Sequence, residues 1–284
     1  MSITSTNELD RAIDALYTDF TISKAAIANG AVGQYISLWR ATGLPAQGAI
    51  PTGVGVGPQT PDNTTTGALN FTNRTLPQRS YISSMEMSST NPIHTLEIHD
   101  RLAHQGGFVG NVTTSQIAAF DFNALLISQN LDARKGDTNY SDIQWWLEWY
   151  TDTGATASNA TINVVFNDGT SGNLSVVAVG GTVRAGRMIP LNSLIASADQ
   201  GKFIRGVNNI TLSASTGTAG NFGITATRYR CSILARSVNV KNSALWDKLG
   251  FPEILASSCL FPVTVIGSGT TSGTVQSKVK MVYM

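Results

Sequence analysis

Apolar and polar residues alternate with a period of two along much of the chain. The clearest run extends from Ile143 to Trp149, where every second residue is large and apolar, and residues 162–167 repeat the pattern. This period places successive side chains on opposite faces of a strand. Residues such as Asn167-Asp168-Gly169 supply turns between strands. Strands are expected at 21–27, 33–41, 93–99, 108–113, 143–150, 160–167, 172–179, 182–188, 208–213, 221–236 and 274–283.

So many short strands separated by turns predict a mainly β protein. An antiparallel, jelly-roll-like sandwich closes two sheets over one core and limits exposed edges. Short helical turns are expected near residues 114–128 and 242–249. No internal repeat is visible, which argues against a solenoid or a propeller.

One amphipathic helix is expected at the start of the chain. Ser5 and Glu8 have the spacing of a capping box. The apolar residues that follow at helical spacing are Leu9, Ile13, Leu16 and Phe20. They predict a helix of about four turns. Its apolar stripe packs either on the sheet of its own domain or on a neighbouring subunit, and the sequence leaves both open.

Residues 43–80 interrupt the strand pattern after a hairpin expected around Ala28-Asn29-Gly30. They contain five prolines and show no period of 2 or 3.6. Such a run cannot build a core of its own, and long unstructured loops are uncommon inside compact domains. Its scattered apolar residues favour an extended arm that becomes ordered on a partner. The predicted division is therefore a helix and hairpin at 1–42, an arm at 43–80 and a β-sandwich at 81–284.

Composition narrows the classes of partner. Charged residues make up 13% of the 284 residues, about half the usual share. Lys and Arg number 19 against 18 Asp and Glu, so the net charge of +1 gives no electrostatic support for binding nucleic acid. No apolar run approaches the roughly 18 residues of a membrane span, and no export signal is visible. Cys231 and Cys259 are expected to be reduced and buried.

No motif points to catalysis, to a metal or to a cofactor. His94, His99 and His104 recur every five residues, which places successive rings on opposite faces of a strand and prevents convergence on one metal. The Gly53-x-Gly55-x-Gly57 run lacks the flanking strand, the helix and the Lys-Ser/Thr ending of a phosphate loop. Nucleophile elbows and zinc-protease motifs are missing as well. We therefore expect a protein that is not an enzyme.

Four aromatic residues at 145–150 form the most informative cluster. Trp145 and Trp149 are expected in the core, because aromatic side chains bury large areas. Trp146 and Tyr150 then point the other way. Three interpretations remain open for this second pair: an interface with another protein, which we favour, cover by a second sheet, or stacking on a sugar ring.

Several segments together resemble the virion structural proteins of tailed bacteriophages. They are HDRLAHQGGFVGNVTT, WLEWYTDTG, VRAGRMIPL and ITLSASTGTAGNFGI. The resemblance extends from SLWRATGLP at residues 37–45 to about residue 236. It implies a virion component, most like a capsid decoration (cement) protein, and it carries over no active site.

This resemblance implies partners and a location. The partners would be the major capsid protein and further copies of the chain, for instance in a trimer, with no nucleic acid and no membrane. The protein would be made in the host cytoplasm and lie on the capsid surface, where it stabilises the assembled lattice. The alternatives are a neck, tail or vertex protein, or a glycan-binding module for host recognition. The interface candidates are Leu9, Ile13, Leu16, Phe20, Ile50, Val54, Leu69, Phe71, Trp146 and Tyr150.

Overall fold

The chain folds into two compact units in a computed structural model that describes residues 5–8, 10, 17–28, 30–129, 131–181 and 184–283. Unit 1 contains the described residues up to 49, residues 62–100 and those from 230 onward. Unit 2 contains residues 50–61 and 101–229.

Two long strands contribute residues to both units. They are β5 (His94–Phe108) and β13 (Asn221–Ala235). The unit boundaries differ from the predicted division at 42/43 and 80/81, because the segment 43–80 is shared between the units.

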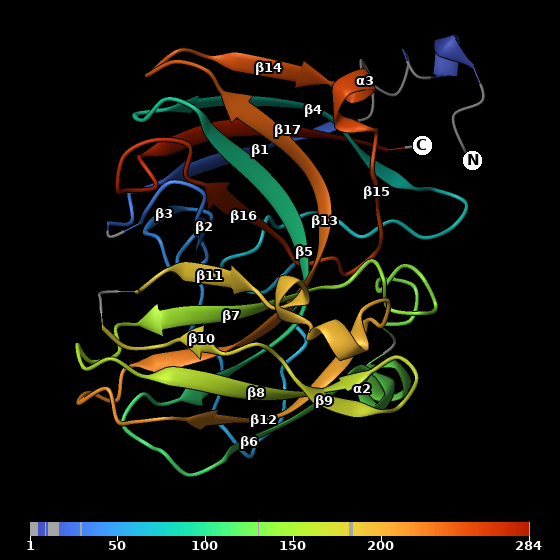
Figure 1. The fold of residues 1–284 in the computed structure, drawn as a ribbon. Helices are drawn as coiled ribbons and strands as arrows, with labels where there is room; N and C mark the ends of the chain where they lie inside the picture. The colour runs from blue at the N-terminus through green and yellow to red at the C-terminus, as the bar shows by residue number, and fades with distance from the viewer. Residues whose placement is uncertain are drawn as a thin grey trace. The chain divides into compact units, whose positions relative to one another are not determined.

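Unit 1 is built on an antiparallel sheet of six strands (Figure 1). The order is β14-β4-β17-β1-β3, and β15 pairs with β4 beside this path. On β17, Val275, Ser277 and Val279 are buried while the residues between them face outward, so one face of the sheet lies in the core. The bounds are β1 Tyr17–Lys24, β3 Gly43–Leu44, β4 Ser80–Ser89, β14 Asn242–Leu245, β15 Glu253–Ile254 and β17 Val275–Tyr283.

A second group of strands completes unit 1. Strand β16 (Leu260–Val265) pairs with β2 (Tyr35–Ser37) on one side and with residues 95–100 of β5 on the other. The short helix α3 (Trp246–Leu249) follows β14. The core of the unit is apolar and includes Ile22, Ile36, Ile82, Met85, Leu96, Ile98, Leu260 and Val279.

Unit 2 contains a sheet of five antiparallel strands. Its order is β10-β8-β12-β6, and β9 pairs with β8. The turn predicted at Asn167-Asp168-Gly169 joins β8 to β9, and Gly169 has the positive φ of 84° that such a turn requires. The bounds are β6 Gln116–Asp121, β8 Asn159–Phe166, β9 Ser171–Asn173, β10 Val177–Ala178 and β12 Ile204–Leu212.

Strand β7 (Gln144–Thr151) is the centre of the other strand group of unit 2. It pairs with β11 (Arg187–Pro190) and with residues 221–227 of β13. Trp145 and Trp149 are fully buried in the core of the unit, as predicted. Helix α2 (Phe122–Gln129) follows β6, and the short 3-10 helices η1 (Asn192–Leu194) and η2 (Ser197–Asp199) follow β11.

The mainly β, antiparallel class is confirmed, although several element boundaries are wrong. Strands β4 and β16 were not predicted. The strand expected at 108–113 does not form, because β5 begins at His94 and ends at Phe108. The helical turns expected at 114–128 and 242–249 begin with strands β6 and β14 and become helical only at α2 and α3.

The N-terminal predictions are partly wrong. The backbone N–H of Glu8 donates to Ser5 Oγ at 3.3 Å, as a helix cap requires, and residues 6–8 and 10 are helical. The helix does not reach Phe20, because that residue lies in β1 and packs in the core of unit 1. No hairpin joins β1 to β2, since the two strands pair with different partners. Asn29 and the candidates Leu9, Ile13 and Leu16 lie outside the described residues.

The segment 43–80 packs on its own chain instead of remaining a free arm. Leu69 and Phe71 are buried in the core of unit 1, and the N–H of Leu69 donates to Leu260 O at 2.8 Å. Val54 packs on the core of unit 2. The prediction of an arm without a core was wrong because a few apolar side chains anchor the segment while its prolines prevent long strands. In the part of the chain that the structure describes, no helix is long and apolar enough to cross a membrane.

Candidate functional site

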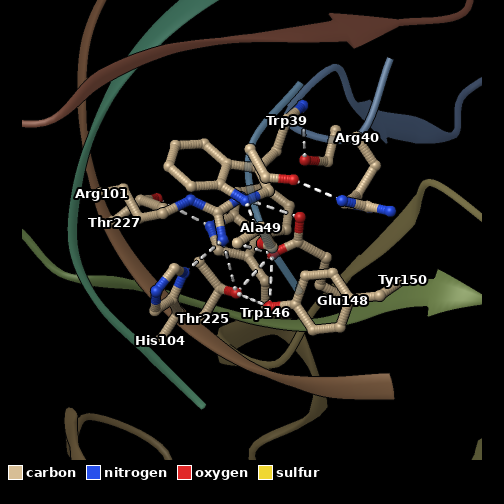
Figure 2. A network of polar contacts seen from close by, with 12 residues as sticks. Trp39, Arg40, Ala49, Arg101, His104, Trp146, Glu148, Tyr150, Thr225 and Thr227 are labelled. Atoms are coloured by element: carbon tan, nitrogen blue, oxygen red, sulfur yellow. Dashed lines mark hydrogen bonds and ion pairs between the residues drawn. The ribbon is translucent and has the colours of Figure 1, made fainter. Parts of the chain in front are cut away.

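A buried ion pair joins two strands of unit 2. The guanidinium of Arg101, in β5, donates to both carboxylate oxygens of Glu148, in β7, at 2.9 and 2.8 Å (Figure 2). The side chains are 0% and 1% exposed. Two parallel N–H···O bonds to one carboxylate are the strongest geometry available to such a pair.

Two hydroxyl groups complete the surroundings of the carboxylate. Thr225, in β13, donates to Glu148 Oε2, and the Tyr150 hydroxyl donates to the same oxygen at 3.2 Å. The hydroxyls of Tyr150 and Thr225 are 3.2 Å apart. Because Glu148 and Tyr150 are two residues apart on β7, they share one face of the strand, opposite Trp145 and Trp149. This local alternation is what brings the polar groups together.

His104 extends the network along β5. Its Nδ1 accepts a hydrogen bond from Arg101 at 3.1 Å. Burial, and secondly the positive charge of Arg101, lower the pKa of His104 well below its usual value. Burial, and secondly the charge of Glu148, raise the pKa of Tyr150. At neutral pH the network therefore holds a neutral imidazole and a neutral phenol beside one ion pair.

The composition of this network is that of an acid–base site, but its arrangement is that of a closed structural cluster. The Glu148 carboxylate is occupied by Arg101, Thr225 and Tyr150, so little capacity remains to accept a proton from a substrate. A buried pair that keeps its partners is a stable part of the interior, and one that loses a partner is costly. The geometry supports a role in holding β5, β7 and β13 in register.

Hollows open on the surface of unit 1, and no residue of the network lines the three described below. One, of about 510 Å³, is lined by residues that include Ser23, Leu44 and Gln276. A second, of about 330 Å³, is lined by charged residues that include the ion pair of Lys241 and Glu86 at 2.6 Å. The third, of about 450 Å³, lies beside β1 and residues 64–70. The first and third hollows are lined mainly by apolar surface and the second mainly by polar surface, and none of the three holds a catalytic constellation.

Trp146 and Tyr150 do not form an exposed aromatic platform. They are 2% and 4% exposed. The indole N–H of Trp146 donates to Thr227 Oγ1 at 2.8 Å, and Tyr150 belongs to the network (Figure 2). Of the three interpretations, cover by the chain's own strands is the one observed. The sugar-stacking hypothesis is wrong for this pair, because it requires exposed rings.

Among the other interface candidates that the structure describes, three are buried within the chain and two are half-buried. Phe20, Leu69 and Phe71 are core residues of unit 1, so they are not free to contact a partner. Ile50 and Val54 are half-buried.

The three histidines make separate contacts. His94 lies between two carbonyl oxygens, His99 pairs with Glu97 at 2.7 Å, and His104 belongs to the network. Among the described residues, no group of three His, Cys, Asp or Glu side chains is placed to hold a metal ion. Cys231 and Cys259 are buried free thiols, as predicted.

Sequence reasoning missed Arg101, Glu148 and Thr225 as a unit. One signal was present: Glu148 stands between tryptophans on a strand that was expected to be covered on at least one face. A carboxylate there requires a buried cation. Its partner is 47 residues away and is identified only by the strand pairing.

Comparisons with known proteins do not assign the chain to a family. No family model matches, and no curated protein matches. One similar solved structure is the infectious bursal disease virus VP2 subviral particle, with 12% identity, cover of 96% of this chain and 81% of that chain, and a TM-score of 0.16. Another is the structure of infectious bursal disease virus Gx strain, with 12% identity and a TM-score of 0.17; the match covers 96% of this chain and 82% of that chain. Likeness at these TM-scores carries no argument about fold or function.

Proposed function

We propose that this chain is a non-enzymatic virion structural protein that binds and stabilises an assembled phage capsid, as a decoration protein does. The observation that carries the proposal is the closure of the Arg101–Glu148 network. Its acid–base groups are buried and bonded to one another, which suits a rigid scaffold better than a reaction centre.

The resemblance to phage virion proteins supports the proposal through the positions of its segments. HDRLAH supplies Arg101 and His104, and WLEWY supplies Glu148 and Tyr150. The segment ITLSASTGTAGNFGI ends one residue before Thr225. These three segments therefore help to build the interior of unit 2, whereas SLWRATGLP at residues 37–45 belongs to unit 1.

In the proposed mechanism the protein stabilises the capsid through the area of its contacts and catalyses no reaction. A protein that binds the assembled lattice and not the free capsid subunit shifts the assembly equilibrium by mass action, and many copies multiply the effect. The proposed partners are the major capsid protein and other copies of this chain, on the capsid surface. Phe20, Leu69 and Phe71 are excluded from that contact by their internal packing.

Copy number and position in purified virions test this proposal. We expect quantitative mass spectrometry combined with cryo-electron microscopy to find hundreds of copies distributed over the head lattice. About a dozen copies at a vertex, neck or tail would overturn the decoration role while keeping a virion role. Absence from purified particles would overturn both.

A further inference from the structure

The buried ring of His94 has a hydrogen-bonding environment that only its protonated form satisfies. His94 is the first residue of β5 and is 0% exposed. Its Nδ1 lies 2.9 Å from Pro92 O, and its Nε2 lies 3.0 Å from Thr271 O. Both partners are carbonyl oxygens, which can only accept. A neutral imidazole has a single N–H, so it can serve one of the two carbonyls but not both.

The other histidines of β5 differ in this respect. The ring of His104 accepts from Arg101 and is held neutral by burial. His99 contacts the carboxylate of Glu97. Only His94 lies between two backbone acceptors, and it has no carboxylate partner among the described residues.

The carbonyls on either side of the ring belong to two loops of unit 1. Pro92 precedes β5, and Thr271 lies in the loop 266–274 that joins β16 to β17. Neutral side chains bind the same carbonyls: Ser268 Oγ donates to Pro92 O at 2.7 Å, and Asn91 Nδ2 donates to Thr271 O at 3.1 Å. The ring is thus the titratable member of a bridge between the two loops.

The loop 266–274 also anchors the connection between β1 and β2. The N–H of Gly30 donates to Thr270 O at 2.7 Å, and the N–H of Ser272 donates to Ile27 O at 2.9 Å. A change in the loop therefore reaches Ile27 and Gly30.

The loop segments that surround His94 contain no charged residues. Residues 89–93, 266–274 and 27–34 contain none. The nearest along neighbouring strands are the buried Lys24 of β1, which pairs opposite Val275, and the Glu97–His99 pair of β5. The exposed Arg236 follows the Ala235 carbonyl bound by Ile93 N–H, and Lys278 lies further along β17. None of them makes a described contact with the His94 ring.

We propose that His94 is a pH-dependent latch of unit 1. In its protonated form the ring donates to both Pro92 O and Thr271 O and ties the loop 266–274 to the start of β5. Loss of the proton leaves one nitrogen lone pair facing a carbonyl oxygen. One of the two hydrogen bonds is then lost, and the contact at that nitrogen becomes repulsive. The loop and its contacts with Ile27 and Gly30 then open more often.

Nuclear magnetic resonance of the full-length, histidine-labelled protein tests the latch directly. At pH 5 we expect both ring nitrogens of His94 to carry protons, while His104 carries one. At pH 8 we expect one proton on His94. A His94 ring with a single proton at pH 5 would overturn the proposal, and this measurement needs no variant.

Hydrogen exchange measures the consequence. After correction for base-catalysed intrinsic exchange, the protection factors of the Gly30 and Ser272 amides should fall roughly fivefold to tenfold between pH 5 and pH 8. The amides of Met85 and Val279, in the centre of the sheet of unit 1, serve as internal controls and should change much less. Equal loss at all four amides would contradict a local latch.

The variant His94→Asn supplies a matched comparison, because its amide can donate but does not titrate. Its Gly30 and Ser272 amides should show protection that no longer depends on pH between 5 and 8. A pH dependence as large as that of the wild type would show that another group is responsible. If the variant does not fold, the ring protons of the wild-type protein decide the question.

Discussion

Glu148 places both carboxylate oxygens against the guanidinium of Arg101, across two strands and 47 residues of sequence. The pair is almost entirely removed from water. Because each charge has lost its hydration, each depends on the other for compensation. The free energy of unfolding should therefore respond far more to the loss of one partner than to the loss of both.

The first prediction concerns this pair. Glu148→Gln should lower the free energy of unfolding by about 3–5 kcal/mol, because it leaves the Arg101 charge buried and uncompensated. The double variant Arg101→Met/Glu148→Leu should lose less, since no charge remains. Urea denaturation of each variant measures the difference. A single variant that is no less stable than the double variant would contradict the role of the pair.

A surface pair provides the matched control for that experiment. Lys241 and Glu86 are 2.6 Å apart, and the Lys241 side chain is 62% exposed. Water and salt already screen both charges. Glu86→Gln should therefore change the free energy of unfolding by no more than about 1 kcal/mol.

The second prediction concerns Cys231, whose thiol contacts the sulfur of Met85 at 3.3 Å in the core of unit 1. Burial raises its pKa to about 12. Only the thiolate is nucleophilic, so native protein at pH 8 should react very slowly with a thiol reagent such as Ellman's reagent. In urea, both Cys231 and Cys259 should react quickly with the same reagent. Rapid reaction of Cys231 in native protein would show that the core opens there.

The sequence predicts the alternation on β7 correctly, but it does not predict what covers the second face. Trp145 and Trp149 are in the core as expected, because a period of two fixes which residues share a face. Whether Trp146 and Tyr150 meet solvent, a partner or the same chain depends on strand order, which local patterns do not encode. The covering group is β13, more than 70 residues later in the sequence.

The missed elements have local causes. In β4, serines occupy buried as well as half-buried positions, so the alternation of apolar and polar residues is blurred. In β16, Pro262 argues against a strand interior, yet it pairs opposite Ile98 of β5. Leu69 and Phe71 stand alone among polar residues, and burial of such isolated side chains is set by tertiary packing.

The third prediction concerns the close approach of β13 to β5 at Gly223. A Cβ placed there would lie 2.0 Å from the carbonyl oxygen of Gln105, so the backbones must separate to accept any side chain. Gly223→Ala should lower the free energy of unfolding by about 2 kcal/mol or more. Gly53→Ala is the matched control, because an added Cβ meets nothing within 4 Å there. Equal midpoints of urea unfolding for the two variants would contradict the close approach.

The last prediction concerns Lys24, a fully buried lysine of β1 whose ammonium donates to Ala41 O at 3.0 Å and to Pro45 O at 2.6 Å. Burial lowers its pKa from 10.5 to about 8. Below pH 8 the group is protonated in both the folded and the unfolded chain, and folding carries the full cost of burying the charge.

Between pH 8 and pH 10.5 the folded chain releases the Lys24 proton while the unfolded chain keeps it. The unfolded chain then binds more protons, so the contribution of Lys24 to stability must rise with pH over this window. The variant Lys24→Met does not titrate at this position. The free energy of unfolding of the wild type minus that of the variant should thus increase by about 2–3 kcal/mol from pH 7 to pH 10. A difference that stays flat would show that the ammonium is solvated in the folded protein.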